Sequence, residues 1–357
     1  MRVYFDKENI VSYIRLMATE SQSEERRFGF KRLMKRELDL YFNCKKEELL
    51  DDRVFRPWIT TMADGRSNDI VWLEERFPKR PLSVDTVKNF SKEEFMAIYL
   101  LQDDMLSDLS DKGMLLMGSV GDELKVLSKL YINRTDNDFC NIYNVQSGQF
   151  SWAVLNESIF PCAEIVLIDR YVFAVKCGKG NEKDCKAKKL KILELNLFPI
   201  LRWACLRNET SRMNIIVFTQ VDMRGGKGKG EKDKDEGKEM GGNVNLIKES
   251  LLKIGCAVNV TIILCPKNQY EHDRFLITNY LRLKSGDSFK YFGLDEEGKM
   301  KLQTHGAELD VACLASRSVY KNTMSVLQRG QDIINELPRG KSNCIIGDKI
   351  SRVFSFE

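Results

Sequence analysis

The segment AEIVLIDRYVF, residues 163–173, decides the fold of the second half of the chain. Its apolar run with a charged pair near the middle is typical of a strand that is buried on both faces. Two more apolar runs follow at 213–219 and 258–265, and helical patterns at 191–206 and 244–254 stand between the three. Strands separated by helices of this length pair in parallel, with the helices on the faces of the sheet. The pattern therefore predicts an α/β domain.

A second stretch, HDRFLITN at 272–279, carries the chemistry. On a strand, residues two apart point to the same face, so His272 and Arg274 can converge on one phosphate while Asp273 points away. A histidine nitrogen can attack phosphorus and form a phospho-histidine, and a neighbouring cation can neutralise the phosphate oxygens. This chemistry requires no metal and no other cofactor.

The same stretch, together with Gly286, resembles the signature H-x-K-x4-D-x6-G of the phospholipase D-like superfamily, with Arg274 in the lysine position and Asn279 in the aspartate position. The chain is most similar to the divergent C-terminal domain that follows microtubule-interacting-and-trafficking domains, over about residues 155–357. The resemblance implies a phospholipase D-like mixed sheet flanked by helices. It also implies catalytic roles for His272, Arg274 and Asn279, and a supporting role for Gly286. By analogy it points to nucleic-acid processing or prokaryotic defence.

Three interpretations of this degenerate motif stay open. The chain has only two histidines, His272 and His305, whereas enzymes of the superfamily normally combine two motifs. A single-motif phosphodiesterase or nuclease would need a homodimer in which two His272 side chains face each other. Alternatively, the motif forms a phosphate- or nucleic-acid-binding pocket without hydrolysis. In the third interpretation it is only the start of a strand, and the chain could then be a non-catalytic protein or membrane assembly adaptor. Whether the protein is an enzyme is left open.

Two groups of residues are expected to assist this motif. Asp169, in the strand at 164–173, is expected near Arg274 as an ion-pair partner, although a strand that emerges into polar surroundings explains it equally well. A lysine-rich segment at 176–191 includes Lys179, Lys188 and Lys189. Lysines on a flexible loop bind backbone phosphates without sequence preference, but a merely solvated loop is the simpler alternative.

Composition and pattern set the remaining expectations. The 357 residues, 43% apolar and 30% charged with a net charge of +4, fit about two globular domains. We expect a mostly helical N-terminal domain of unknown role at 1–155, with helices at 24–42 and 91–109, and a phospholipase D-like domain at 156–357. Residues 224–243, rich in Gly, Lys, Asp and Glu, are expected to be a flexible insertion. Ten scattered cysteines, the lack of a secretory signal pattern and the lack of a long apolar run predict a cytoplasmic chain without a transmembrane segment.

Overall fold

A computed structural model of the chain describes the following residues: 1–5, 32–42, 44–53, 55–64, 69–72, 91–100, 113–117, 130, 132, 138–147, 150–158, 160–175, 182–208, 210–220, 229–265, 274–303, 308–337 and 344–356. The chain divides into two compact units, each with its own sheet. The first comprises Met1–Cys140 and Ala312–Met324, and the second comprises Asn141–Val311 and Ser325–Glu357.

The first unit contains a five-stranded sheet in the order β3-β2-β1-β4-β5. Its strands are β1 (Arg2–Phe5), β2 (Asp39–Phe42), β3 (Ile70–Trp72), β4 (Ile98–Leu100) and β5 (Leu115–Met117). All four pairings between these neighbours are parallel. The short helices α3 (Lys46–Leu50), α4 (Phe55–Ala63) and α6 (Lys92–Phe95) belong to the same unit.

Aromatic side chains stack across these strands because the parallel register places like residues side by side. Tyr4 pairs with Tyr41 and with Tyr99, and its ring centroid lies 5.0 Å from the centroid of each. Phe42 likewise stacks on Phe5 at 5.3 Å and on Trp72 at 4.9 Å. Successive residues of a strand point to opposite faces, so the tyrosines line one face and the other aromatic rings line the opposite one.

The predicted helices of this N-terminal part need correction. The helix expected at 24–42 is helical at 32–36, but its last residues form β2, and the helix expected at 91–109 ends at Phe95 and is followed by β4. The predicted capping box at Ser91 is confirmed, since the side chains of Ser91 and Glu94 each accept a hydrogen bond from the other residue's backbone N–H. The expectation of a mostly helical domain is therefore wrong for the described core of this unit, which is a parallel sheet.

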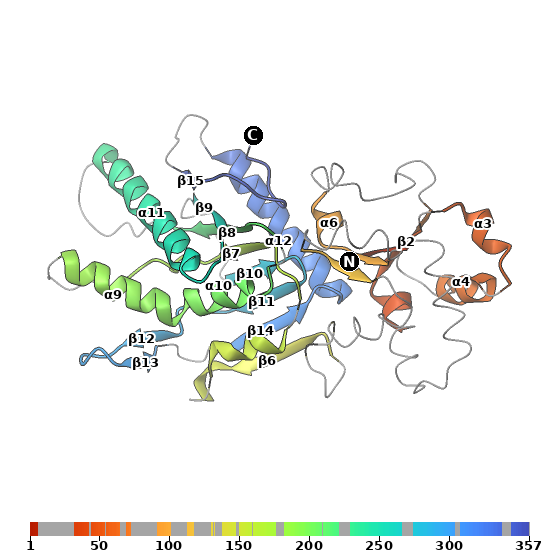
Figure 1. The fold of residues 1–357 in the computed structure, drawn as a ribbon, viewed down its shortest axis with the longest axis horizontal. Coiled ribbons are helices and arrows are strands. Elements are labelled where there is room, and N and C mark those ends of the chain that lie inside the picture. The colour runs from red at the N-terminus through yellow and green to blue at the C-terminus, as the bar shows by residue number, and fades with distance from the viewer. Residues whose placement is uncertain are drawn as a thin grey trace. The chain divides into compact units, whose positions relative to one another are not determined.

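The second unit contains an eight-stranded mixed sheet in the order β15-β9-β8-β7-β10-β11-β14-β6 (Figure 1). Its central strands β7 (Glu164–Ile168), β8 (Met213–Thr219) and β9 (Val258–Leu264) are parallel, as predicted. Strand β10 (Arg274–Thr278) pairs antiparallel with β7 and forms an antiparallel hairpin with β11 (Leu281–Ser285). The remaining strands of the sheet are β6 (Cys140–Asn144), β14 (Glu308–Cys313) and β15 (Ile345–Gly347). A separate hairpin is formed by β12 (Phe292–Leu294) and β13 (Met300–Leu302).

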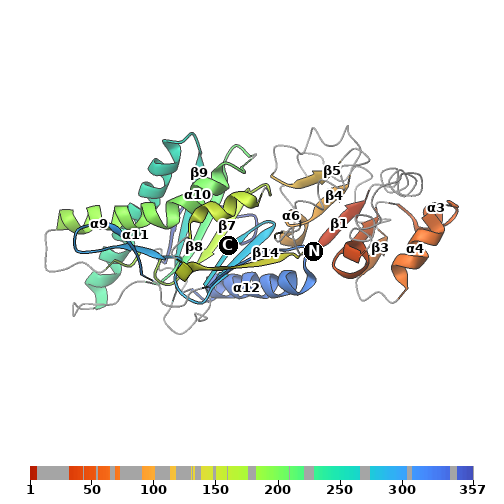
Figure 2. The ribbon, with the colours of Figure 1, turned by 90° about the horizontal axis from the view of Figure 1, so that it is seen from below.

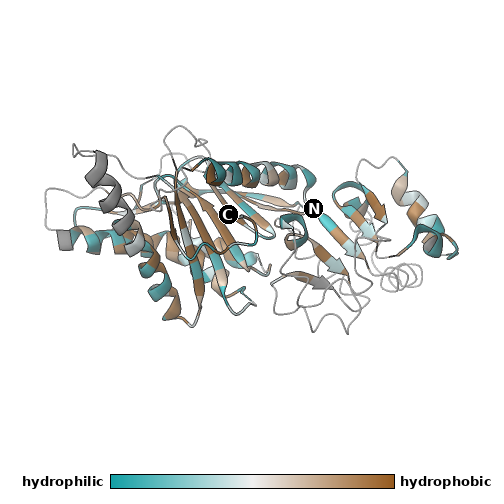
Figure 3. Ribbon diagram, turned by 90° about the horizontal axis from the view of Figure 1, so that it is seen from above, coloured by the Kyte–Doolittle hydropathy of each residue, from teal (hydrophilic) through white to brown (hydrophobic). Residues whose placement is uncertain are grey.

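Helices cover both faces of this sheet. The helices α9 (Glu182–Leu195), α10 (Leu197–Cys205) and α11 (Lys229–Leu252) lie on one face (Figure 2). The part of α12 (Arg317–Glu336) that belongs to this unit, from Ser325 onward, lies on the other. Gly330 of α12 approaches Phe218 of β8, where an added Cβ would lie 3.2 Å from the ring. The central strands are mainly apolar and almost completely buried, as expected for strands covered on both faces (Figure 3). This is the mixed α/β architecture expected for the second half.

The predicted flexible insertion at 224–243 also needs correction. Its residues from Lys229 onward form the first half of α11, while residues 224–228 lie outside the described part of the chain. The second half of α11 buries Val244, Ile247 and Leu251. This packed half can anchor the polar half, whose Lys and Glu residues have good helix propensity. No helix in the described part of the chain is long and apolar enough to cross a membrane.

A buried polar network fixes the C-terminal segment at the edge where the parallel strands begin. Asn259, Asn214 and Glu164 lie side by side on β9, β8 and β7, and each asparagine amide donates to the next side chain at 3.0 Å. The Glu164 carboxylate also accepts from the Ser351 hydroxyl at 2.5 Å and from the backbone N–H of Arg352 at 2.6 Å. This network therefore ties the chain terminus to the sheet.

Candidate anion-binding site

The candidate site lies at the opposite edge of the sheet, where β7 and β8 end and β10 begins. Phe275 pairs with Ile168 across β10 and β7, so the next pair outward is Arg274 with Asp169. On the other side of β7, the backbone N–H of Gln220 donates to the carbonyl of Arg170 at 3.4 Å. Ligands of open α/β sheets bind outside the carboxyl ends of the strands, which is where these residues gather. We call the group Asp169, Arg170, Tyr171, Gln220, Arg274 and Ser288 the carboxyl-edge cluster.

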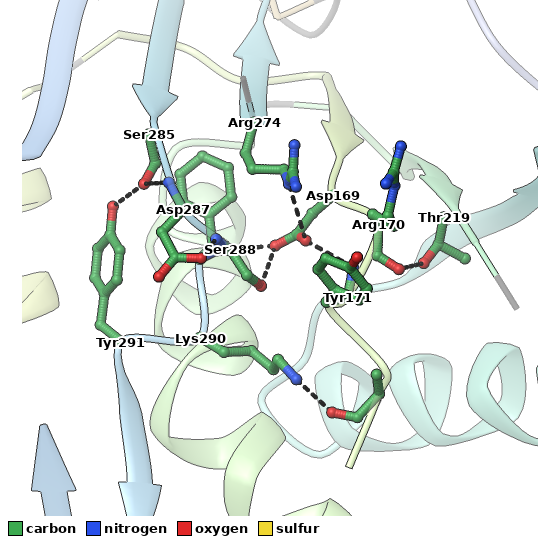
Figure 4. Close-up of polar contacts among 12 residues, drawn as sticks. Asp169, Arg170, Tyr171, Thr219, Arg274, Ser285, Asp287, Ser288, Lys290 and Tyr291 are labelled. Carbon is green, nitrogen blue, oxygen red and sulfur yellow. Dashed lines mark hydrogen bonds and ion pairs between the residues drawn. The ribbon is translucent and has the colours of Figure 1, made fainter. Parts of the chain in front are cut away.

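Asp169 is the fully buried anchor of this cluster (Figure 4). One carboxylate oxygen accepts from the backbone N–H of Tyr171 at 2.9 Å. The other accepts from the Ser288 hydroxyl and from the backbone N–H of Phe289, both at 2.8 Å. These three bonds hold the turn after β7 against the segment that follows β11. Asp169 therefore fixes the position of Tyr171.

Burial raises the pKa of Asp169, and its three hydrogen bonds and the nearby Arg274 charge oppose that rise. The direction follows from the loss of water around a carboxylate that has no exposed surface.

Two guanidinium groups lie over the Tyr171 ring. The Arg170 guanidinium carbon lies 5.9 Å from the ring centroid, and that of Arg274 lies 5.8 Å from it. The tips of the two side chains point to the same side of the turn, away from Lys290 (Figure 4). The Arg274 Nε atom lies 4.0 Å from the nearer Asp169 oxygen, at the limit of an ion pair. The Arg274 side chain is only 9% exposed, whereas Tyr171 is 43% exposed.

Further polar groups approach the same turn. Within the described part of the chain, the Gln220 side-chain amide nitrogen is buried and has no hydrogen-bond partner. Buried donors are usually satisfied, so such an atom is often explained by a ligand or a water. The Lys290 ammonium donates to the carbonyl of Ala174, and the Lys189 ammonium lies 5.9 Å from the Phe173 ring centroid. The turn at 170–174 thus lies among four cationic side chains.

The structure brings together some of the predicted site residues and separates others. The expected pairing of Asp169 with Arg274 is present. Asn279 is fully buried at the far end of β10, where its side-chain oxygen accepts from the backbone N–H of Ala163 at 3.4 Å. Asn279 lies five positions after Arg274 along the chain, which is about 16 Å at ~3.3 Å per residue. Asn279 is therefore not placed beside Arg274. His272 lies outside the described residues.

The predicted lysines stand on a helix instead of a flexible loop. Lys188 and Lys189 belong to α9, and the Lys189 ammonium pairs with Glu239 at 2.8 Å. Lys179 lies outside the described residues. Gly286 follows β11 in the turn that leads to Ser288, and a Cβ added there would meet no atom within 4 Å. Gly286 is part of this turn, but the space around it does not require a glycine.

Sequence reasoning did not single out Arg170, Tyr171, Gln220 or Ser288 as site residues. The signal that could have found Arg170 and Tyr171 is their place directly after a buried parallel strand. Gln220 holds the equivalent place after the next strand. Ser288 could not be found in this way, because it approaches Asp169 through a turn.

Comparison of the chain with protein-family models, with curated proteins and with solved structures finds no match in any of the three. The phospholipase D-like assignment therefore stays a prediction.

Proposed function

We propose that the protein binds a phosphate-bearing ligand, with nucleic acid as the first candidate, at the carboxyl-edge cluster of a degenerate phospholipase D-like domain. The observation that carries the proposal is the pair of guanidinium groups, Arg170 and Arg274, on one turn with the Tyr171 ring. Guanidinium groups bind phosphate oxygens through two parallel hydrogen bonds, and two of them can hold adjacent phosphates.

A purely structural ion pair explains this arrangement less well. Asp169 already accepts three hydrogen bonds from Tyr171, Ser288 and Phe289, so its oxygens do not depend on Arg274. The separation of 4.0 Å between Arg274 and Asp169 is longer than a charge-assisted hydrogen bond of about 2.7–2.9 Å. Both arginine tips also extend away from the Asp169 carboxylate (Figure 4).

The alternative of a homodimeric phosphodiesterase has less support. In that mechanism Asn279 would orient the imidazole of His272, two residues before Arg274. Asn279 instead bonds to Ala163 at the opposite edge of the sheet. Binding without hydrolysis is the function that the described residues favour.

Fluorescence anisotropy with a labelled oligonucleotide at several salt concentrations tests the proposal. We expect Arg274→Gln to weaken binding at least tenfold, because a charge-assisted contact of about 1.5–3 kcal/mol is lost. The slope of log affinity against log salt should fall by about one. Lys299→Ala is the matched control, because it removes a positive charge on the separate β12–β13 hairpin, where the side chain is 74% exposed.

The proposal is wrong if Arg274→Gln and Lys299→Ala bind as the parent protein does while circular dichroism shows all three to be folded. It is equally wrong if the parent shows no salt-dependent binding to any oligonucleotide. Cleavage of the probe in excess chelator, lost in His272→Ala, would establish the phosphodiesterase alternative in its place.

A further inference from the structure

The exposed Tyr171 ring is the feature of the carboxyl-edge cluster that phosphate binding alone does not use. Phosphate recognition needs the arginines, the buried amide and the backbone, but it does not need an aromatic face. Tyr171 nevertheless leaves 43% of its surface exposed. The next two residues of the turn, Val172 and Phe173, are buried. The chain therefore presents one aromatic ring to solvent and hides the other.

The backbone of Tyr171 is also held in a fixed place. Its backbone N–H donates to Asp169 at 2.9 Å, and its carbonyl accepts from the backbone N–H of Ala174 at 3.0 Å. Buried Val172 and Phe173 anchor the same turn from below. An aromatic residue whose backbone is already fixed loses less conformational entropy when it contacts a ligand. This geometry suits a stacking platform better than a mobile surface tyrosine does.

Two cationic groups lie close to this ring. The guanidinium carbons of Arg170 and Arg274 lie 5.9 Å and 5.8 Å from the ring centroid. A base that stacks on the ring would bring its own phosphates within reach of both side chains. Proteins that bind single strands combine such basic groups with aromatic rings on which bases stack. The bases of a duplex are already stacked on one another and cannot occupy such a ring without unpairing.

We infer that the ligand of the carboxyl-edge cluster is a single-stranded nucleic acid, with one base stacked on Tyr171 and the flanking phosphates held by Arg170 and Arg274. This inference rests on the proposed function, because it assumes that the cluster binds phosphate. It adds that the base contributes to affinity, that the contact is independent of base identity, and that duplexes bind less well.

The test compares three labelled probes of equal length: a single strand, the same strand with abasic sites at every position, and a duplex. The abasic strand keeps the phosphates and lacks the bases, so it separates the two contributions. We expect the parent protein to bind the single strand at least about fivefold more tightly than the abasic strand. Tyr171→Ala should abolish this preference, whereas Tyr171→Phe should retain it. A 2-aminopurine base in the strand should lose fluorescence on binding to the parent but not to Tyr171→Ala.

The outcomes distinguish this inference from the proposed function. Equal binding of the base-bearing and abasic strands would overturn base stacking and leave phosphate binding in place. Tight duplex binding that Tyr171→Ala does not change would also overturn it. If the folded parent protein binds none of the three probes, the proposed function itself is overturned. If a free nucleoside monophosphate competes as well as the unlabelled strand does, the ligand is a mononucleotide, and the inference of a single strand is wrong.

Discussion

Arg274 and Asp169 face each other across β10 and β7, one residue beyond the last paired positions, with 4.0 Å between the Arg274 Nε and the Asp169 carboxylate. The two charged groups of this pair have different surroundings. The carboxylate is bound to the turn that follows β7, while the guanidinium is left beside the Tyr171 ring. Asp169 thus fixes the turn through its hydrogen bonds, and Arg274 places a cation beside the same turn.

Replacing Asp169 by asparagine tests its role as an anchor. The amide side chain could accept hydrogen bonds through one oxygen only, so at least one of the donors Tyr171, Ser288 and Phe289 would lose its partner. Leaving a buried donor unsatisfied costs about 1–3 kcal/mol. We expect Asp169→Asn to lower the free energy of unfolding by that amount in urea titrations. Ser288→Ala, which removes one of the three bonds, is the graded control and should cost less. Unchanged stability of the Asp169→Asn variant would show that the turn does not depend on this carboxylate.

The buried Glu164 makes stability depend on pH. Burial raises its pKa, against the opposing effects of Ser351, Arg352 and Asn214. The folded protein therefore binds a proton on Glu164 more tightly than the unfolded chain does. This contribution is fully present below the unfolded pKa of about 4.3, and it is lost as the pH rises through the raised folded value.

Glu164→Gln isolates this contribution, because it removes the titrating carboxyl group and keeps the shape of the side chain. The amide substitution should also lower the free energy of unfolding by an amount that does not depend on pH, because the amide nitrogen or oxygen would face the donors of Arg352 and Asn214. The variant's free energy of unfolding should fall less steeply than that of the parent as the pH rises from 4 toward neutrality. Parallel pH profiles of the two proteins, measured by urea denaturation, would show that Glu164 does not titrate differently in the folded state.

Asn279 is expected to be a structural residue. It is fully buried, and it bonds to the backbone of Ala163 at the start of β7. Asn279→Ala should cost about 1–3 kcal/mol of stability, because the Ala163 N–H would be left unsatisfied. Oligonucleotide binding by the remaining folded protein should be unchanged. A variant with normal stability but altered binding or cleavage would return Asn279 to the site.

Asn279→Asp restores the residue of the superfamily signature and gives a sharper test. A carboxylate at this fully buried position would lose its hydration, so its pKa should rise. We expect the destabilisation relative to the parent to grow as the pH rises and to shrink at low pH, where the side chain is neutral. Thermal unfolding of both proteins at pH 4 and pH 7 measures the difference.

The central strands of the second unit could be predicted because their burial on both faces gives long apolar runs. Strands β2 and β4 could not, because they have four and three residues and their neighbours fit a helical spacing. Only pairing with β1 makes them strands. The first half of α11 could not be predicted as a helix either, because the residues that stabilise it lie outside this half. Its polar composition predicts disorder, whereas the packed residues Val244, Ile247 and Leu251 lie farther along the same helix.

The candidate site was predictable only where one strand carries the information. The motif drew attention to Arg274, and the acidic residue within the first predicted strand of the domain drew attention to Asp169. The neighbourhood of Arg170, Tyr171 and Gln220 depends on the register between β7 and β8, which no local pattern specifies. The role of Asn279 could not be predicted for the same reason. The sequence shows its place in the motif, but its hydrogen-bond partner Ala163 is 116 residues away along the chain.

The two cysteines Cys205 and Cys256 provide a final prediction. They form a disulfide between the end of α10 and the turn before β9, across 51 residues of sequence. Gly255, with φ of +77°, makes this turn after α11 and brings Cys256 toward Cys205. A cross-link over a loop of this length stabilises a fold by roughly 2–4 kcal/mol, chiefly by restricting the unfolded chain.

Reduction should therefore lower the free energy of unfolding by about that amount. The double variant Cys205→Ser/Cys256→Ser should start at the lower stability and respond less to reductant, although Cys185 is also disulfide-bonded and would keep some response. Thiol alkylation of the unreduced protein, followed by mass spectrometry, checks the pairing directly. Full alkylation of Cys205 and Cys256 without reductant would contradict the cross-link, and the double variant would then differ from the parent only by the loss of buried sulfur.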